Sequence, residues 1–400
     1  MNYKRLIFVL VFFLVILSSY FIWENLSSNS EKSWDSGGIK NDEEEQISNV
    51  TLSPEFLKFG GNNFSNQSIF DVYTLRDFDG QIVAATSGDF NDDGLLDFAI
   101  SMIDNFSRII IMYNEGGLQF RLKEIYAKYE GFNSLVSGDF DNDGDVDLIF
   151  SSNERITHNN ISIKVNGTIN ILFNKGNGNF TNESLIIKRG NGKIDEYGRI
   201  NPRVTSADFD DDDDVDILIS DNSGKVELFR NDGFGNFSSD GIVGDFGSLA
   251  WGLTSCDYDG DGDIDFFVSA TEKYKVTRGH IFIQDNNINL KGADFETFPE
   301  KIIANVFHLP SNGNMKCIDY DGDQDIDLLV ASETILYIMV NDNGSYSELS
   351  VLGYVSKHEG GYEHFGISGV AVGDFDGDGF NDFIIGAETG TLRLFLNKLD

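Results

Sequence analysis

Proline, cysteine and positive charge are all scarce in this sequence. Four prolines and 42 glycines among 400 residues favour many tight turns between strands over a disordered chain. Basic residues number 29 against 66 acidic ones, which gives a formal net charge of −37 at pH 7. Because nucleic-acid binding needs a basic surface to neutralise phosphates, this balance argues against a nucleic-acid partner.

The two cysteines, Cys256 and Cys317, each lie just before an aspartate-rich run. Their offsets from these runs differ by one residue, and in a strand that difference points two side chains to opposite faces. We therefore expect two buried thiols, with a disulfide bond as the alternative.

Common catalytic motifs are absent as well. No GxSxG motif, Cys/His constellation or phosphate-binding glycine loop occurs. None of the five histidines forms an HxH or HExxH pair. They are His158, His280, His308, His358 and His364. We expect that the protein is not an enzyme; the alternative is a polysaccharide lyase or hydrolase that uses a loop Tyr, His or Arg.

The N-terminus has an apolar segment, residues 6–23, directly after Lys4 and Arg5. About 18 apolar residues are just long enough to span a bilayer. With no A-x-A-like cleavage site or lipobox cysteine, residues 1–23 are predicted to be an uncleaved signal-anchor in the cell membrane, with the remainder outside. A cleaved signal peptide and a secreted protein form the alternative. Residues 24–60 are polar and are predicted to be a disordered stalk.

Acidic residues are concentrated in six nine-residue runs whose starts are 50, 69, 49, 62 and 55 residues apart. Small and apolar residues precede each run, and a strand-like apolar segment follows it. The runs are DFNDDGLLD from Asp89, DFDNDGDVD from Asp139, DFDDDDDVD from Asp208, DYDGDGDID from Asp257, DYDGDQDID from Asp319 and DFDGDGFND from Asp374.

Four short strands in each of six units of about 55 residues are typical of a β-propeller. We predict an all-β fold over residues 61–400, a six-bladed β-propeller of four-stranded antiparallel blades, with seven blades as the alternative. The last unit lacks its fourth strand, and residues 60–75 resemble residues 176–190. The N-terminal strand is therefore predicted to join the last blade and close the ring, which protects sheet edges.

Asp or Asn occupies positions 1, 3, 5 and 9 of every run, and position 6 is usually Gly. Calcium takes six to eight hard oxygen ligands, and glycine permits the sharp turn around the ion. An EF-hand is excluded because position 12 is apolar in every run, whereas an EF-hand requires Glu there. We predict up to six structural Ca²⁺ ions, with weaker or differently shaped sites where Asp213 and Gln324 replace the glycine.

The predicted ligands are the side chains at positions 1, 3, 5 and 9 and the carbonyl at position 7. They are Asp89, Asn91, Asp93, Leu95 and Asp97; Asp139, Asp141, Asp143, Asp145 and Asp147; Asp208, Asp210, Asp212, Asp214 and Asp216; Asp257, Asp259, Asp261, Asp263 and Asp265; Asp319, Asp321, Asp323, Asp325 and Asp327; and Asp374, Asp376, Asp378, Phe380 and Asp382.

The runs, the small residues before them and turns such as NKGNGNF and NDGFGNF resemble the FG-GAP/VCBS repeat family, which includes the integrin α-subunit propeller. The resemblance covers residues 62–400. It implies a calcium-stabilised propeller that is usually extracellular and often serves adhesion or ligand binding. The family's calcium ligands correspond to positions 1, 3, 5, 7 and 9 of each run.

The longest loops, residues 153–167, 189–203, 271–279 and 357–366, are expected on the face opposite the calcium turns. We predict an adhesion or recognition module for a protein or an acidic glycan outside the cell; the alternative is a purely structural surface protein. The candidate ligand-binding residues on these loops are Tyr197, Arg199, Lys273, Lys275, Arg278, Tyr362 and His364.

Overall fold

The computed structural model describes residues 44–46, 70–128, 131–158, 161–181, 184–190, 202–220, 223–246, 250–272, 275–284, 286, 301–307, 314–332, 335–347, 350–354 and 366–398, all within the unit Gly38–Asp400. These residues form strands and turns, and none of them belongs to a helix that could cross a membrane. The predicted signal-anchor, residues 1–23, lies outside them.

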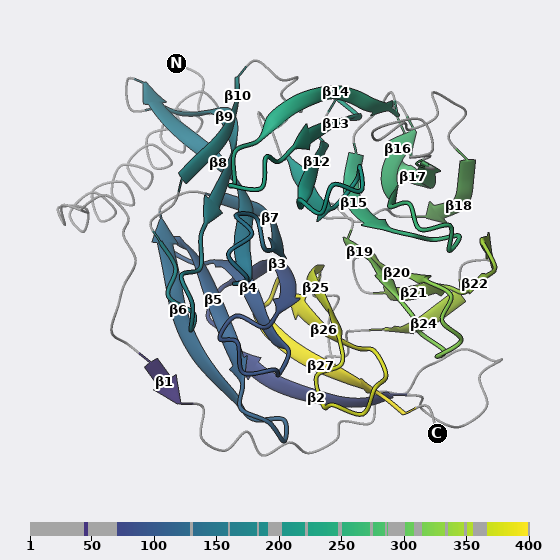
Figure 1. The fold of residues 1–400 in the computed structure, drawn as a ribbon, viewed down its shortest axis with the longest axis horizontal. Helices are drawn as coiled ribbons and strands as arrows, with labels where there is room; N and C mark the ends of the chain where they lie inside the picture. The colour runs from purple at the N-terminus through teal and green to yellow at the C-terminus, as the bar shows by residue number, and fades with distance from the viewer. Residues whose placement is uncertain are drawn as a thin grey trace, which may run out of the picture. The chain divides into compact units, whose positions relative to one another are not determined.

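Six four-stranded antiparallel blades make up the fold, as predicted (Figure 1). Blade 1 comprises β3 (Gln81–Gly88), β4 (Asp97–Ile103), β5 (Ser107–Asn114) and β6 (Phe120–Lys128). Blade 2 comprises β7 (Gly131–Gly138), β8 (Asp147–His158), β9 (Ile161–Leu172) and β10 (Ser184–Gly190). Blade 3 comprises β11 (Arg203–Ala207), β12 (Asp216–Ser220), β13 (Lys225–Arg230) and β14 (Ser238–Asp245).

The second half of the ring repeats this order. Blade 4 comprises β15 (Ala250–Cys256), β16 (Asp265–Glu272), β17 (Lys275–Gln284) and β18 (Lys301–Phe307). Blade 5 comprises β19 (Asn314–Ile318), β20 (Asp327–Ser332), β21 (Ile335–Met339) and β24 (Ser350–Tyr354), with the small hairpin β22 (Asn341–Asp342) and β23 (Ser345–Tyr346) between its last two strands. Blade 6 comprises β25 (Ile367–Gly373), β26 (Asp382–Ala387), β27 (Thr391–Asn397) and β2 (Phe70–Asp77).

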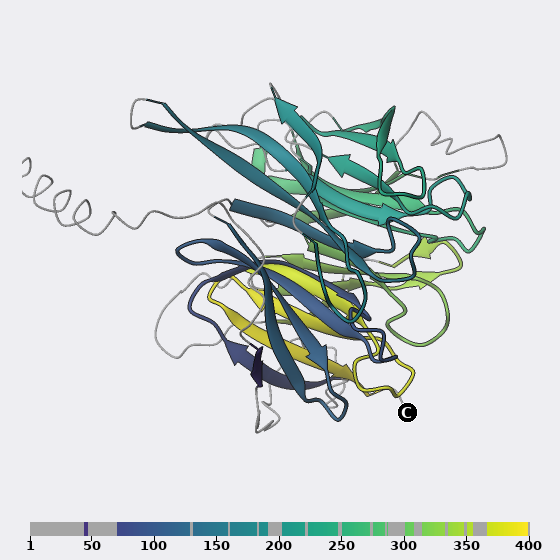
Figure 2. The same ribbon diagram turned by 60° about the vertical axis from the view of Figure 1, so that its left-hand side comes forward.

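The blades form a closed ring, because the first strand of each blade contacts the first strand of the next, and β25 contacts β3. The predicted N-terminal closure is confirmed: β2 pairs antiparallel with β27, from Phe70 opposite Asn397 to Asp77 opposite Thr391. Figures 1 and 2 show β2 (purple) beside the C-terminal strands (yellow). β1 (Glu44–Gln46), within the predicted stalk, adds to blade 1 by pairing with β6.

Apolar side chains fill all six interfaces between neighbouring blades. The second strands are buried on both faces, which explains why β12 reads DILIS and β26 reads DFIIGA. The aromatic residue at position 2 of each run belongs to the interface with the following blade. Phe90 and Phe140, for example, are fully buried. Each such ring stabilises the closed fold by about 1.5–3 kcal/mol.

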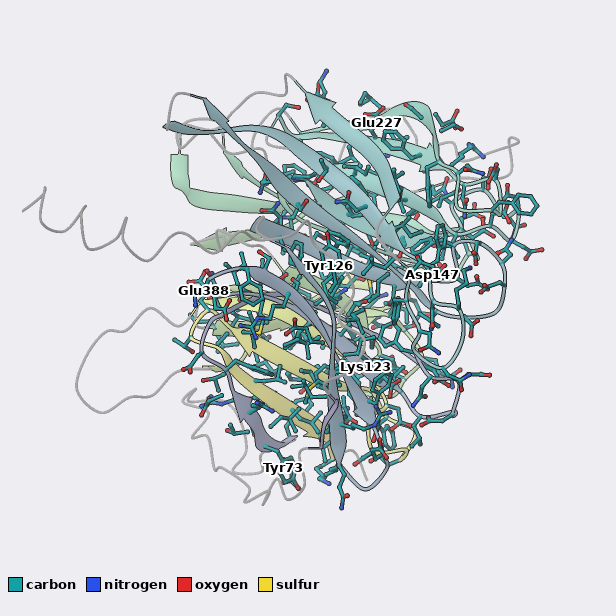
Figure 3. All side chains as sticks on the ribbon, turned by 90° about the vertical axis from the view of Figure 1, so that its left-hand side faces the viewer. Tyr73, Lys123, Tyr126, Asp147, Glu227 and Glu388 are labelled. Carbon is teal, nitrogen blue, oxygen red and sulfur yellow. A yellow bond between two sulfur atoms is a disulfide. The ribbon has the colours of Figure 1, made fainter. Side chains whose placement is uncertain are left out.

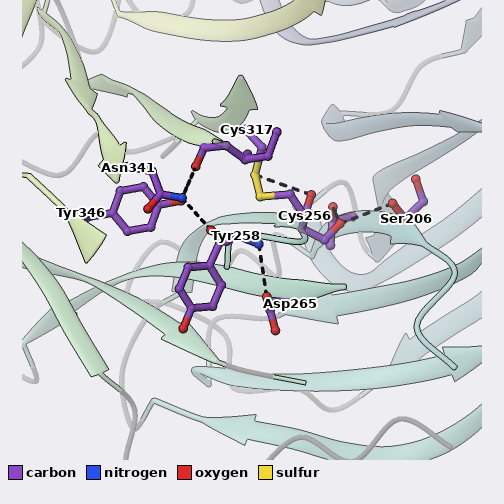
Figure 4. The surroundings of a disulfide bond; sticks show 10 residues. Ser206, Cys256, Tyr258, Asp265, Cys317, Asn341 and Tyr346 are labelled. Atoms are coloured by element: carbon purple, nitrogen blue, oxygen red, sulfur yellow. Dashed lines mark hydrogen bonds between the residues drawn. A yellow bond between two sulfur atoms is a disulfide. The ribbon is translucent and has the colours of Figure 1, made fainter. Parts of the chain in front are cut away.

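The two cysteines form a disulfide bond, so the expectation of two buried thiols was wrong. The alternation of faces applies to strands of one sheet, whereas β15 and β19 are the inner strands of different blades. Cys317 lies with its Sγ 3.7 Å from the carbonyl oxygen of Ser255, the residue before Cys256 (Figure 4). This stagger brings the two Cα atoms to 6.4 Å, within the range of a disulfide.

Removal of the disulfide is expected to lower the free energy of unfolding by about 3 kcal/mol, because the bond closes a loop between residues 61 apart in sequence. The double variant Cys256→Ala and Cys317→Ser tests this, since serine occupies the position of Cys317 in blades 1 to 4. Urea unfolding of the variant and of the reduced wild type should show the same loss. Equal stability of the reduced and oxidised proteins would contradict the prediction.

Candidate metal centres

Each aspartate run joins the first and second strands of its blade, as predicted. The backbone turns at two left-handed residues in every loop. Position 6 has φ between 69° and 99°, and this includes Asp213 and Gln324, where the left-handed conformation costs about 1 kcal/mol. Position 4 has φ between 54° and 80° and is Asp, Asn or Gly in every run, a signal that the sequence analysis did not use.

The position-1 carboxylate organises the loop. In all six loops its Oδ2 accepts a hydrogen bond from the amide nitrogen of position 6, over 2.8–3.2 Å. The other oxygen accepts a bond from the amide of position 4 or 5, as Asp139 Oδ1 does from Asp143. The loop therefore wraps around the first carboxylate before any ion is considered.

The position-9 aspartate is fully buried and joins the loop to the third strand of its blade. Asp147, labelled in Figure 3, accepts bonds from the amide of Phe140 at 3.0 Å and of Asn174 at 2.7 Å. Burial raises the pKa of Asp147 to about 7, and it does the same to Asp97, Asp216 and Asp382. A buried carboxylate of this kind favours a nearby cation, which would stabilise its charged form.

Without metal, the protein is expected to lose stability as pH rises from 5.5 to 8. Burial raises the pKa of five position-9 carboxyls to about 6 to 7, while unfolded aspartate titrates near about 3.9; they are Asp97, Asp147, Asp216, Asp327 and Asp382. The folded state therefore binds more protons in this window, so the free energy of unfolding falls with pH. Urea unfolding in EDTA at pH 5.5 and at pH 8 measures this fall in the free energy of unfolding. A flat or rising profile would count against the prediction, and calcium should abolish the decrease.

Carboxylates at positions 1, 3 and 9 converge in blades 2 to 6. In each of these loops, one oxygen from each of the three aspartates lies within 4.8 Å of the others. The groups are Asp139, Asp141 and Asp147; Asp208, Asp210 and Asp216; Asp257, Asp259 and Asp265; Asp319, Asp321 and Asp327; and Asp374, Asp376 and Asp382. In blade 1 the neutral Asn91 takes position 3, so only two carboxylates of this set remain.

These donors fit a hard divalent cation. The Oδ1 atoms of Asp141 and Asp210 are buried and have no hydrogen-bond donor, so each is free to bind an ion. The position-9 oxygens accept one bond each and keep a second lone pair, except Asp216 Oδ2, which is buried with no hydrogen-bond donor. The position-5 carboxylates lie outside the converging groups and accept the amide of position 7 instead, as Asp143 does from Asp145. Ligation by positions 5 and 7 stays a prediction.

Two loops already contain a cationic side chain. In blade 2 the Lys175 ammonium lies 2.8 Å from Asp141 and 3.1 Å from Asp143, and its hydrogen bond to Asp141 raises the pKa of Lys175. In blade 3 the Arg230 guanidinium pairs with Asp210. No described cation forms an ion pair with positions 1, 3 or 9 in blades 5 and 6. Blades 2 and 3 should therefore bind metal more weakly.

The variant Lys175→Met is expected to tighten calcium binding at one site by about fivefold, because a competing ion pair worth up to about 1 kcal/mol is removed. Calorimetric titration of the metal-free protein measures the change. Lys225→Met is a matched control, since Lys225 is exposed and its only described ion pair, with Asp245 at 4.0 Å, is remote from the loops. A titration curve unchanged by Lys175→Met would refute competition.

An asparagine at the end of the third strand, or one or two residues after it, links neighbouring blades in all six repeats, which the sequence analysis missed. Its Nδ2 donates to the position-2 carbonyl of the preceding blade over 2.6–3.1 Å, and to the position-8 carbonyl of its own loop over 3.1–3.4 Å. Its amide nitrogen donates to the position-9 aspartate. These inter-blade asparagines are Asn114, Asn174, Asn231, Asn286, Asn341 and Asn397. The repeated Asn after segments such as TINILF was the available signal.

The predicted ligand-binding face falls mainly outside the described residues. Tyr197, Arg199, Lys273, Tyr362 and His364 lie outside them, as do the side chains of Lys275 and Arg278. The backbone of Lys275 pairs with Glu272 in the hairpin between β16 and β17. This hairpin is at the end of blade 4 opposite its aspartate loop, as the predicted position of the long loops requires.

Comparisons with known proteins agree with the repeat pattern. A family model described as FG-GAP-like repeat matches residues 58–150, 208–268 and 319–398, more than half of the chain. No curated protein matches the sequence. Similar solved structures include an Agrocybe aegerita lectin described as recognising non-reducing terminal N-acetylglucosamine (17% identity, TM-score 0.45, 82% of this chain and 87% of that chain). Another is a glucose dehydrogenase (12% identity, TM-score 0.49, 81% and 98%). Neither likeness is close enough to indicate function.

Proposed function

The chain belongs to the FG-GAP-like repeat family, and from this premise we propose that it is a calcium-stabilised propeller that acts outside the cytoplasm as an adhesion or ligand-recognition module. The observation that carries the proposal is that the same cluster of three aspartate carboxylates recurs at the same place in five consecutive blades. Chance acidic turns would not bring positions 1, 3 and 9 together each time. A ring of calcium loops on one face leaves the opposite face and its long loops for a partner.

Two features support a place outside the cytoplasm. A structural disulfide between Cys256 and Cys317 suits an oxidising compartment. The apolar segment at residues 6–23, preceded by Lys4 and Arg5, has the pattern of an export signal. The proposal is therefore a cell-surface propeller held by an N-terminal anchor, or a secreted one if that segment is cleaved.

The proposed partner is an extracellular protein or glycan. The long loops contribute 10 of the 29 basic residues of a chain with formal net charge −37. Arg199, Lys273, Lys275 and Arg278 would attract acidic groups, and the aromatic rings at positions 197 and 362 would stack on sugars or apolar side chains.

Two measurements test the proposal. Calorimetry of the metal-free protein with calcium should show several binding sites per chain. Glycan and surface-protein arrays, probed in calcium and again in EDTA, should show a ligand that is retained only in calcium. Absence of calcium binding would overturn the proposal that calcium stabilises the propeller. Blank arrays with the calcium-loaded protein would overturn the proposal that it recognises a ligand. Cleavage of an arrayed glycan would instead identify an enzyme.

A further inference from the structure

The inner strands of the six blades surround a central cavity of about 410 Å³. Its wall is rich in hydroxyl groups. Where serine occurs two residues before a run, its Oγ donates to the backbone carbonyl at the same position in the preceding blade, over 2.6–3.4 Å. These residues are Ser87, Ser137, Ser206 and Ser255. Their hydroxyls are committed to holding the blades together.

Threonines three residues before a run line the same cavity. Thr86 shares a hydrogen bond of 2.8 Å with Ser137 of the next blade, and Thr205 shares one of 2.9 Å with Ser255. The equivalent neighbour of Thr254 is Cys317, whose sulfur is in the disulfide and offers no hydroxyl. No described residue is hydrogen-bonded to the Thr254 side chain, which therefore has spare donor capacity at the wall between blades 4 and 5.

Lys316 lines the cavity beside this threonine, on the adjacent inner strand β19 and at the same distance from its run. The other blades have Thr, Val or Ala at this position. No carboxylate or carbonyl among the described residues accepts a bond from its ammonium group. Lys316 is half-buried at the cavity wall, and desolvation by the surrounding protein lowers its pKa to about 8. Partial desolvation of an amine that has no partner among the described residues is costly, so a ligand that supplies the missing charge would be bound favourably.

The residues that line the cavity indicate which kind of ligand would bind there. The ammonium requires an anion, the free threonine hydroxyl can donate a second bond, and the remaining wall offers hydroxyl and carbonyl groups to a polar body. The volume lies within the range of small-molecule sites. Among the described residues of the wall, Asp319, at position 1 of its run, is the only one with an acidic side chain, and a cation in its loop would offset its charge.

We propose that the central cavity binds a small hydroxylated carboxylate, of the size of a sugar acid, through Lys316 and Thr254. The carboxylate accepts bonds from the Lys316 ammonium and the Thr254 hydroxyl, and the ligand hydroxyls contact the polar wall. This site is separate from the predicted face formed by the long loops. It therefore does not depend on the adhesion proposal.

Calorimetry with D-glucuronate as the probe tests the site in the full-length protein with calcium. Wild type should bind glucuronate, and neutral D-glucose should bind at least about tenfold more weakly. Lys316→Met and Lys316→Thr should each weaken glucuronate binding about tenfold or more, corresponding to one charged hydrogen bond. Thr254→Val should weaken it a few-fold. Lys225→Met, which removes an equal charge from the exposed first residue of β13, should leave binding unchanged.

A second measurement keeps the proposal testable if a variant does not fold. Glucuronate should slow acetylation of Lys316 in the wild type, followed by mass spectrometry, while glucose and acetylation at Lys225 serve as controls. Absence of glucuronate binding by the wild type overturns the proposal, as does equal binding by folded Lys316→Met or acetylation of Lys316 that the probe does not slow.

Discussion

Excess EDTA is expected to lower the melting temperature of this protein by about 10 °C or more at pH 7.5. At about 1 mM calcium and a dissociation constant of about 0.1 mM, each occupied loop adds about 1.4 kcal/mol. Six loops would add about 8 kcal/mol, which is comparable to the net stability of a whole domain. Since Lys175 and Arg230 already compensate two loops, the full sum is an upper value.

Differential scanning calorimetry measures the effect, with calcium-saturated EDTA as the control for the chelator itself. The variant Asp265→Asn removes one charge from the blade 4 group and should lose part of the calcium-dependent gain, because Asp265 converges with Asp257 and Asp259. Melting curves that coincide in EDTA and in calcium would remove the basis for a metal-stabilised ring.

The variant Asn231→Ala is expected to destabilise the protein by about 3 kcal/mol. Asn231 is buried, and its Nδ2 donates to Phe140 of the preceding blade at 2.9 Å and to Val215 at 3.1 Å. Its Oδ1 accepts bonds from the amides of Asp232 and Gly235. Truncation leaves two carbonyls unsatisfied and opens a small cavity, and each unsatisfied buried group costs about 1–3 kcal/mol.

Asn236→Ala is the matched control, because Asn236 lies in the same hairpin but is exposed, and Asp232 is its one hydrogen-bond partner among the described residues. Its effect should stay within about 0.5 kcal/mol. Asn231→Asp should destabilise at least as much as the alanine variant, since a carboxylate oxygen would face two carbonyls. Urea unfolding in calcium compares the three. Similar stabilities of Asn231→Ala and Asn236→Ala would show that the inter-blade bond is dispensable.

Local pattern and repetition were sufficient to predict the six blades. The alternation of strands, the spacing of the runs and the likeness of residues 60–75 to residues 176–190 gave the ring and its closure by β2. The glycine usual at position 6 indicated a sharp turn there, and the backbone is left-handed at this position even at Asp213 and Gln324. All of these features depend on residues close in sequence or on comparison of one repeat with another.

Contacts between blades could not be predicted in the same way. The rule that alternate residues face opposite sides failed for Cys256 and Cys317 because their strands belong to different sheets, whose stagger is a property of the ring. The role of Asn231 likewise depends on a carbonyl 91 residues earlier in the chain. That Lys316 lines the central cavity could not be predicted either, because it depends on how the first strands of the six blades are arranged around the ring.

The pairing of β2 with β27 has a consequence for biosynthesis. Strand β2 is translated before the other strands of the six four-stranded blades, yet its partner β27 is the last of those strands to emerge from the ribosome. Its hydrogen-bonding edge therefore has no native partner throughout elongation, and an unpaired edge invites association with other chains. Moving residues 70–77 behind residue 398 by circular permutation should let blade 6 assemble as a simple hairpin series and reduce misassembly of the newly made chain.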